Sequence, residues 1–319
     1  MTDADFRTVG ILGTGTIGSS WASFFAVNGM AVRMFDADGA TLERGLAAAR
    51  SNVDALGGFG LANEDDVAAA KERLRPVSSV AEVASDVGYV QESVVERYDV
   101  KKEVFAEMDR ASSPETVIAS SSSGLLMTEI QKAMERPERA LIAHPFNPPH
   151  LVPLVELVPG ERTSAAIVAA VREFFERLGK TPVVLQKEVP GHIANRLAAA
   201  LWREAIDLVH SGVATVEDVD RALYAGPGIR WALMGQHMIY HVGGGEAGYR
   251  GFIDHIGATF EEYWRSMASW TEIPPEAKEA VVSGVEESAK GRSLADLAAW
   301  RDGKLVAVLK ALGPSEGRR

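Results

Sequence analysis

A histidine and a glutamate twelve residues apart are the groups best suited to move a proton in this chain. His144 ends a short apolar run, and Glu156 lies inside the apolar stretch Leu151–Val158. A carboxylate buried in such a stretch needs a partner, because an unpaired buried charge is costly. Held against an imidazole, Glu156 would fix the tautomer of the ring and stabilise the imidazolium that forms on proton abstraction. The pair is a candidate base; a packed or surface histidine and an edge-strand glutamate facing water are the alternatives.

Four consecutive serines, Ser120–Ser123, follow a β-branched run that begins at Val117. Hydroxyls at the end of a strand could donate a hydrogen bond to a substrate oxygen, or could cap the next helix. The residues alone leave both roles open and do not indicate which serine would act.

A glycine-rich turn near the N-terminus indicates a dinucleotide site. It consists of Gly13, Thr14, Gly15, Thr16, Ile17 and Gly18, between an apolar run and an apolar helical stretch. Gly13 allows the tight turn, Gly15 lets the backbone approach a pyrophosphate, and Gly18 allows close packing of helix on sheet. The N-terminus of the helix adds positive potential. Three glycines at this spacing can occur by chance in a glycine-rich chain. Here, however, a strand, the turn, a helix, a second strand and an acid follow one another in the order that a dinucleotide site requires.

The acid is Asp36, which ends the second strand. A carboxylate at this place accepts hydrogen bonds from both ribose hydroxyls and repels a 2′-phosphate. No arginine directly follows Asp36, so the pattern predicts NAD rather than NADP. The expected contacts to NAD are Gly13, Gly15, Thr16, Ile17, Gly18 and Asp36.

The elements that must position these groups predict an α/β fold with a mostly parallel sheet, because short β-branched runs alternate with helical patterns. The expected strands are Val9–Leu12, Ala31–Asp36, Val87–Gln91, Val117–Ser120, Leu141–His144, Val152–Val158 and Val183–Leu185. After Lys187 only helical periodicity continues, with Pro190-Gly191 as the break. A chain of 319 residues also exceeds one hydrophobic core. We expect a Rossmann-type NAD-binding domain at residues 1–187, an all-helical domain at 188–319, and a frayed tail at Pro314–Arg319.

The composition excludes several classes of function. A net charge of −11 and a pI near 5.2 create a negative field that repels nucleic acid and anionic lipid. The chain has no cysteine, which removes disulfides, thiolate nucleophiles and cysteine-ligated metals, and no metal site is expected. Thr2–Arg7 lacks the apolar core of a secretory signal, and no uncharged run reaches the roughly 18 residues of a membrane span. We expect a soluble, cytoplasmic protein.

Together these motifs resemble the 3-hydroxyacyl-CoA dehydrogenase family over nearly the whole chain, including its L-carnitine dehydrogenase branch and its lambda-crystallin or L-gulonate 3-dehydrogenase branch. The resemblance implies that His144 and Glu156 are the catalytic pair and that Ser123 binds the reacting hydroxyl. The asparagine of the family's P-G-x-x-x-N-R-L motif falls on Asn195, which would place the substrate's oxygens. Further cofactor contacts are implied for Glu96, Lys101, Ser123 and Asn147.

The resemblance implies NAD-dependent oxidation of a 3-hydroxyl group and leaves the substrate open. One alternative is a short free 3-hydroxy acid similar to L-carnitine or L-gulonate. Trp202 and Trp231 could then face a quaternary ammonium while Arg203 or Arg230 pairs with a carboxylate, unless both tryptophans are ordinary core. The other alternative is a short-chain CoA thioester. The segment Asn63–Arg75, with three bases among its acids, is as typical of a solvated helix as of a CoA rim.

His192 departs from the family pattern, since a phenylalanine is expected at this position. This leaves the exact substrate open. A non-catalytic, crystallin-like NAD-binding protein is an alternative of another class, against which the intact set of His144, Glu156, Ser123 and Asn195 argues. Amphipathic patterns after Pro190, and the pairing of family members through this part of the chain, predict a homodimer.

Overall fold

The computed structural model describes residues 6–313, which form two compact units that divide between Asn195 and Arg196. The tail expected at Pro314–Arg319 and most of the segment Thr2–Arg7 lie outside the described residues. The domain boundary that the sequence places near residue 188 lies ahead of this division and stays a prediction.

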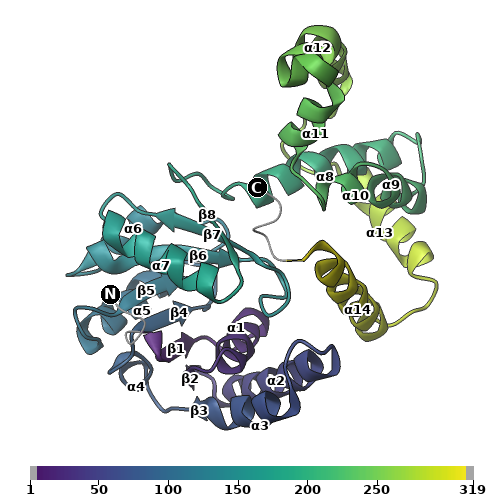
Figure 1. Cartoon of the computed structure of the whole chain (residues 1–319). Helices are drawn as coiled ribbons and strands as arrows, with labels where there is room; N and C mark the ends of the chain where they lie inside the picture. Colours follow the sequence, from purple (N-terminus) through teal and green to yellow (C-terminus); the bar gives the residue numbers. More distant parts are fainter. Residues whose placement is uncertain (1–5, 314–319) are drawn as a thin grey trace. The chain divides into compact units, whose positions relative to one another are not determined.

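An eight-stranded sheet forms the centre of the first unit (Figure 1). Its strands are β1 (Thr8–Leu12), β2 (Ala31–Phe35), β3 (Leu74–Pro76), β4 (Tyr89–Glu92), β5 (Val117–Ser120), β6 (Ala140–Pro145), β7 (Leu154–Pro159) and β8 (Thr181–Val184). They lie in the order β3-β2-β1-β4-β5-β6-β7-β8, and all neighbours are parallel except β6 and β7. The predicted α/β fold with a mostly parallel sheet is confirmed.

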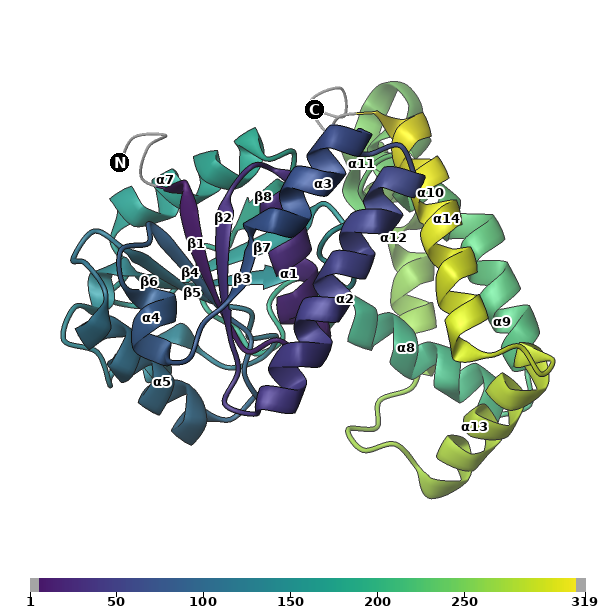
Figure 2. The same ribbon diagram turned by 90° about the horizontal axis from the view of Figure 1, so that it is seen from below.

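Helices cover both faces of this sheet and bury two apolar cores against it. One face carries α1 (Thr16–Val27), α2 (Gly39–Gly58), α3 (Glu64–Arg73) and α7 (Ala165–Arg177), packed around Trp21, Phe25, Phe174 and Phe175. The other face carries α4 (Val80–Ala84), α5 (Tyr98–Ala111) and α6 (Met127–Gln131), packed around Phe105, Met108 and Ile130. In Figure 2, α4 and α5 accordingly lie across the strands from α1 and α2. The short 3₁₀ helix η2 (Pro137–Arg139) leads into β6.

The seven expected strands are all present, with ends that differ from the expectation by at most two residues. The sequence analysis missed β3, which lies in the segment Asn63–Arg75 and just beyond it. This strand has three residues at the edge of the sheet, and only Leu74 is buried. So short a run carries no measurable alternation, and Pro76 is tolerated because an edge strand leaves one side without a partner.

The second unit consists of helices joined by loops, with no strand among its described residues. It contains most of α8 (Ala194–His210), α9 (Val216–Leu223), the π-helix η3 (Tyr224–Gly228), α10 (Ile229–Trp231), α11 (Gln236–Gly243), the 3₁₀ helix η4 (Gly245–Ala247), α12 (Gly248–Ser266), α13 (Pro275–Ala289) and α14 (Leu294–Leu312). Among its described residues the buried apolar side chains are Ile206, Val216, Ala277 and Val306, a small core for so many helices. None of the helices in residues 6–313 is both long enough and apolar enough to cross a bilayer.

Candidate active site

The polar residues singled out in the sequence gather at the carboxyl ends of neighbouring strands in the first unit. The chain leaves β1 on one side for β2 and later returns to pair β4 on the other side, so the winding direction reverses at β1. Open parallel sheets bind their ligands outside the carboxyl ends of the strands at such a point. The glycine turn follows β1, Asp36 follows β2, Glu96 follows β4 and Ser123 follows β5. His144 is the second-to-last residue of strand β6, farther along the same edge.

His144 and Glu156 are directly opposite each other in the antiparallel pair formed by β6 and β7. The Nδ1 atom of His144 lies 2.9 Å from Oε2 of Glu156, and both side chains are buried. A carboxylate only accepts, so Nδ1 carries the proton and donates it to Glu156. In the neutral form of the ring, Nε2 of His144 then has a lone pair that can accept a proton from an alcohol.

Glu156 is held on its other side by the start of helix α8. Its Oε1 atom accepts hydrogen bonds from the backbone N–H groups of Ile193 and Ala194, each at 2.9 Å. Burial by itself raises the pKa of Glu156, but the hydrogen bonds from His144, Ala194 and Ile193 outweigh it and hold this pKa below its usual value. The carboxylate therefore stays charged at neutral pH, and the positive end of a helix stabilises it further.

The loop after β5, residues 121–124, is fastened by one carboxylate. Oε1 of Glu96 accepts hydrogen bonds from Ser122 Oγ at 2.6 Å and from the backbone N–H groups of Ser123 and Gly124 at 2.9 and 3.1 Å. Burial raises the pKa of Glu96, yet the Ser122 hydroxyl, the Lys101 ammonium and the two N–H groups lower it below its usual value. Ser123 remains exposed, so its side chain is accessible while its backbone is held.

Lys101 lies beneath this loop and is almost fully buried. Its ammonium donates to Glu92 at 2.7 Å and lies 3.4 Å from Oε2 of Glu96. Glu92 in turn accepts from the hydroxyl of Ser120 at 2.6 Å. In this structure Lys101 thus supports Glu96 and the end of β5, and it reaches the surface of the site only through these partners.

The glycine turn has the shape that a dinucleotide requires. Gly13 adopts a φ of +86°, and a Cβ on Gly18 would lie 1.8 Å from the carbonyl oxygen of Gly13. A Cβ on Gly15 would meet nothing within 4 Å, so the space over this residue is open to a ligand. The carboxylate of Asp36 accepts the Thr14 N–H at 2.8 Å, which holds it beside the turn. These residues fit the pyrophosphate and the ribose of NAD.

The loop between β6 and β7 carries Asn147, which is exposed. A buried lysine holds this loop from below, since Nζ of Lys180 donates to the carbonyl oxygens of Val152, at 2.8 Å, and Pro149. Burial lowers the pKa of Lys180 to about 7. Ser20 on α1 adds a second attachment, because its hydroxyl lies 2.7 Å from Nδ1 of His150 and accepts the backbone N–H of the same residue at 3.0 Å. The loop that joins the two strands of the His–Glu pair is therefore anchored to the helix that follows the glycine turn.

Asn195 is close to the serine loop within the first unit. Its Nδ2 atom donates to the carbonyl oxygen of Ser123 at 3.3 Å. The structure thus brings His144, Glu156, Ser123 and Asn195 into one connected group. Gly13, Gly15, Thr16, Ile17, Gly18, Asp36, Glu96 and Asn147 lie at or next to the carboxyl edge of the same sheet.

The four candidate substrate residues lie in the second unit, on α8 and α10. Trp202 is 59% exposed and Trp231 is 38% exposed, so neither tryptophan belongs to the core of the described chain. Trp231 donates its ring N–H to Gln236, and Arg203 donates to the carbonyl oxygen of Trp270 at 3.4 Å. Arg230 is exposed.

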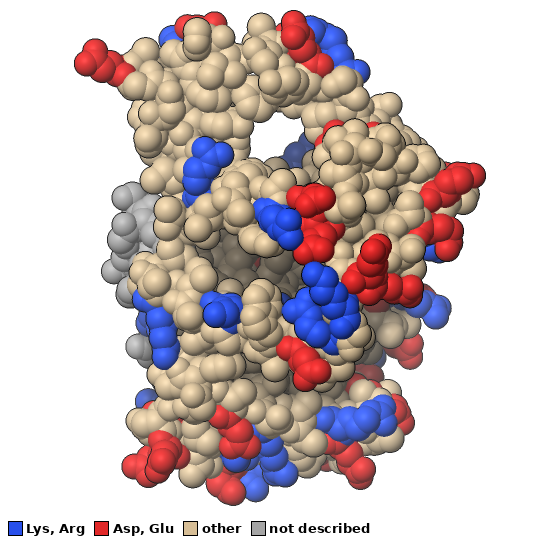
Figure 3. All heavy atoms as spheres, turned by 90° about the vertical axis from the view of Figure 1, so that its right-hand side faces the viewer, with Lys and Arg blue, Asp and Glu red and all other residues tan. Residues whose placement is uncertain are grey.

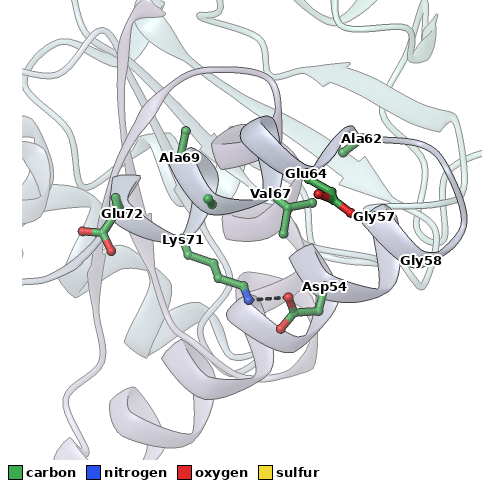
Figure 4. Close-up of a pocket in the computed structure, with 10 residues that line it drawn as sticks. Asp54, Gly57, Gly58, Ala62, Glu64, Val67, Ala69, Lys71 and Glu72 are labelled. Atoms are coloured by element: carbon green, nitrogen blue, oxygen red, sulfur yellow. Dashed lines mark ion pairs between the residues drawn. The ribbon is translucent and has the colours of Figure 1, made fainter.

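A cavity of about 770 Å³ lies between α2 and α3 and contains none of these candidate residues (Figure 4). Its wall includes the ion pair of Lys71 with Asp54, drawn as a dashed line. Arg73 on the same helix donates to the backbone carbonyl of Ala26 at 3.1 Å. Two of the three bases in the segment Asn63–Arg75 are thus bound within the chain, which favours the interpretation of α3 as a surface helix over that of a CoA rim.

The sequence analysis missed several polar residues that support the site, above all Gln91, Glu92 and Lys180. Gln91 donates to Ser121 Oγ at 2.8 Å and to the carbonyl oxygen of Ala143 at 3.2 Å. The signal was present, because Gln91 and Glu92 end a strand whose other residues are apolar, and buried polar side chains need partners. Lys180 carried no signal, since a lysine after a helix is usually exposed.

Comparisons with known proteins identify the family to which this chain belongs. The family model described as the NAD-binding domain of 3-hydroxyacyl-CoA dehydrogenase matches residues 8–189, and the model of the C-terminal domain of the same enzyme matches residues 191–283. The L-carnitine dehydrogenase of Streptomyces coelicolor is 42% identical to this chain over 98% of each protein. The L-carnitine dehydrogenase of Pseudomonas aeruginosa is 43% identical over 98% of this chain and 96% of its own length.

Two solved structures extend the similarity. One is 5-formyl-3-hydroxy-2-methylpyridine 4-carboxylic acid 5-dehydrogenase, an NAD⁺-dependent dismutase, with a TM-score of 0.82 and 29% identity over 98% of this chain and 100% of that chain. The other is FadB2 of M. tuberculosis, with a TM-score of 0.69 and 31% identity over 88% of this chain and 94% of that chain.

Proposed function

Since the chain belongs to the 3-hydroxyacyl-CoA dehydrogenase family, and is an NAD-dependent oxidoreductase that acts on a CH–OH group, we propose that its substrate is L-carnitine. The product would be the corresponding 3-keto acid. The single observation that carries the chemistry is the buried pair of His144 and Glu156, which meet through Nδ1, so that Nε2 of the neutral ring can act as a base. The L-carnitine dehydrogenases that match almost the full length of this chain support a free acid, rather than a CoA thioester, as the substrate.

In the proposed reaction, His144 accepts the proton of the 3-hydroxyl group on Nε2. The resulting imidazolium is stabilised by Glu156 through the hydrogen bond on Nδ1. Ser123 donates to the same substrate oxygen, and Asn195 orients the substrate. NAD, when bound, supplies the acceptor for the hydride that leaves C3, so that the alcohol loses one proton and one hydride in total.

Several residues would hold NAD. Gly13, Gly15, Thr16, Ile17 and Gly18 form the proposed pyrophosphate site, and Asp36 binds the ribose hydroxyls. Glu96 would orient the serine loop and face the cofactor, with Lys101 fixing Glu96 from behind. Asn147, on the loop held by Lys180, completes the proposed contacts.

The proposed domains are residues 1–187 for NAD binding and residues 188–319 for substrate binding and dimerisation. L-carnitine carries a quaternary ammonium and a carboxylate, which suit an aromatic face and a guanidinium. The exposure of Trp202, Trp231 and Arg230 supports their candidacy. Arg203 would have to exchange its bond with the Trp270 carbonyl for one with the ligand.

The substrate assignment predicts a clear order of specificity constants. With NAD, L-carnitine should give a larger kcat/KM than L-gulonate, 3-hydroxybutyrate or 3-hydroxybutyryl-CoA, measured by NADH absorbance at one enzyme concentration. The matched control is 4-(trimethylammonio)butanoate, which lacks only the 3-hydroxyl and should bind without turnover. NADP should support far less activity, because Asp36 repels a 2′-phosphate. A dominant thioester would overturn the choice of a free acid, and silence with every alcohol would favour the structural, crystallin-like alternative.

A homodimer is the assembly that we propose. Large apolar side chains of the second unit are exposed, among them Leu197, Tyr263, Trp264 and Leu294. In Figure 3 the upper part, where α11 and α12 lie, presents mostly uncharged atoms. Such surfaces on helices are typical of interfaces between subunits. Light scattering should give twice the 34.2 kDa mass of the chain; a lone 34.2 kDa species at micromolar concentration would contradict the proposal.

We propose a cytoplasmic enzyme that binds neither nucleic acid nor membranes. The negative net charge supports this. On the face shown in Figure 3, described basic and acidic side chains are interspersed rather than gathered into one basic area.

A further inference from the structure

His192 is a buried histidine beside the proposed base that none of the steps above uses. It has no exposed surface, and its ring centroid lies 5.3 Å from that of His144. Its Nε2 atom lies 3.1 Å from the carbonyl oxygen of Ser122. Among the described residues, Nδ1 of His192 has no hydrogen-bond partner.

The backbone at this residue is also unusual. His192 adopts a φ of +51°, in the left-handed region that residues with a side chain seldom occupy. Such a conformation is unfavourable for a residue with a side chain and persists only where surrounding contacts enforce it. The side-chain bond to Ser122 and the two N–H groups that follow, which bind Glu156, are contacts of this kind.

The contacts determine the protonation state of the ring. A carbonyl oxygen only accepts, so Nε2 of His192 carries a proton and Nδ1 is bare. Burial lowers the pKa of His192, and a charge on His144 lowers it further, while the Ser122 carbonyl and Glu156 oppose this shift. The neutral ring is thus the form that fits beside a base that becomes positive during the reaction.

We propose that His192 is a positioning residue, a neutral Nε2–H donor that ties the serine loop to the turn that holds Glu156. The inference rests on the proposed function, because it assigns Ser123 to the substrate hydroxyl. Residues 192–195 bind both the serine loop and Glu156. The side chains of His192 and Asn195 donate to the carbonyl oxygens of Ser122 and Ser123. The backbone N–H groups of Ile193 and Ala194 donate to Glu156. A phenylalanine at this position could fill the space but could not donate.

Two substitutions separate the hydrogen bond from the volume of the ring. His192→Phe keeps an aromatic ring and loses the donor, so kcat with the best alcohol substrate should fall about threefold to tenfold, the value of one hydrogen bond, while the Kd of NAD is unchanged. His192→Gln places an amide N–H at the reach of Nε2 and should restore most of the lost kcat. Thermal unfolding of each variant identifies losses that arise from misfolding. Full activity of the His192→Phe variant would overturn the proposal. So would a kcat of the His192→Gln variant that is no larger than that of the His192→Phe variant when both have the same Tm.

A second measurement does not depend on turnover. In ¹⁵N NMR spectra of the unmodified protein, the histidine signals that disappear in the His192→Gln variant should show a protonated Nε2 and a bare Nδ1 between pH 6 and pH 8. An imidazolium at pH 7, or a proton on Nδ1, would contradict the assignment of His192. Failure of every alcohol substrate with the expected tautomer intact would instead refute the proposed function.

Discussion

Replacement of His144 by alanine should lower kcat by about 10²- to 10⁴-fold, which is the usual contribution of a positioned acid–base group. The physical reason is that Nε2 of His144 is the unprotonated nitrogen of a buried pair, held in this tautomer by the bond of Nδ1 to Glu156. Water cannot replace a base in this geometry. The Kd of NAD, measured by fluorescence titration, should stay within about twofold, because the glycine turn and Asp36 are untouched.

A second variant guards against loss of the fold. His144→Ala leaves a buried carboxylate without its partner, which can unfold the protein for reasons unrelated to catalysis. His144→Asn retains an N–H group near the position of Nδ1 and so keeps a donor for Glu156, yet it has no base at the position of Nε2. It should lose as much kcat as the alanine variant. The matched control is His210→Asn, at the exposed end of α8, which should keep full activity. An active His144→Asn enzyme would contradict the role of the imidazole as base.

Glu156→Gln should lower kcat by a comparable order, about 10²-fold or more. The carboxylate accepts from His144 through one oxygen and from Ile193 and Ala194 through the other. With its single oxygen toward the N–H groups of Ile193 and Ala194, the amide presents its NH₂ group to Nδ1 of His144. It then favours the tautomer in which Nε2 carries the proton, and the imidazolium loses the charge that stabilises it.

The pH–rate profile distinguishes electrostatic support from simple packing. Because the pKa of Glu156 is lowered, this carboxylate becomes protonated only at a pH below the usual pKa of a glutamate. Its contribution to stability is lost as the pH falls through this lowered pKa. An acidic limb of the kcat profile at a pH above this lowered pKa does not arise from Glu156. In the Glu156→Gln variant this limb should move to lower pH, since the protonated ring is less favoured. An unchanged profile with full activity would reduce Glu156 to a structural residue.

The double variant His144→Asn with Glu156→Gln gives an independent check. Residues that act as a unit lose their effect together, so the double variant should be no slower than the slower single variant by more than a few fold. Multiplied losses would show that the two residues contribute separately. Glu173→Gln, on the exposed face of α7, is the matched control for the loss of a carboxylate and should leave both kcat and the profile unchanged.

The sequence by itself determined the α/β fold, the position of the glycine turn and the candidate pair, because these signals are local. The turn requires glycine where a Cβ would collide, as at Gly18, and this requirement is visible in a few consecutive residues of the sequence. Strands appear in the sequence as short β-branched runs. A carboxylate in an apolar run indicates that the folded chain provides a partner for it. The residues alone made His144 a candidate partner of Glu156, and the resemblance to the family implied the pair.

Only the tertiary structure decided how these residues are held. That β6 and β7 are antiparallel, which sets His144 opposite Glu156, depends on the short loop between them and on its attachments to Lys180 and α1. The attachments join residues far apart in the chain, as with Glu156 and the start of α8, and no local pattern records which backbone N–H will meet which carboxylate. The same holds for His192. In the sequence it is a departure from an expected phenylalanine, and only burial and the distance to Ser122 give it a role, because a hydrogen bond depends on where the fold places both partners.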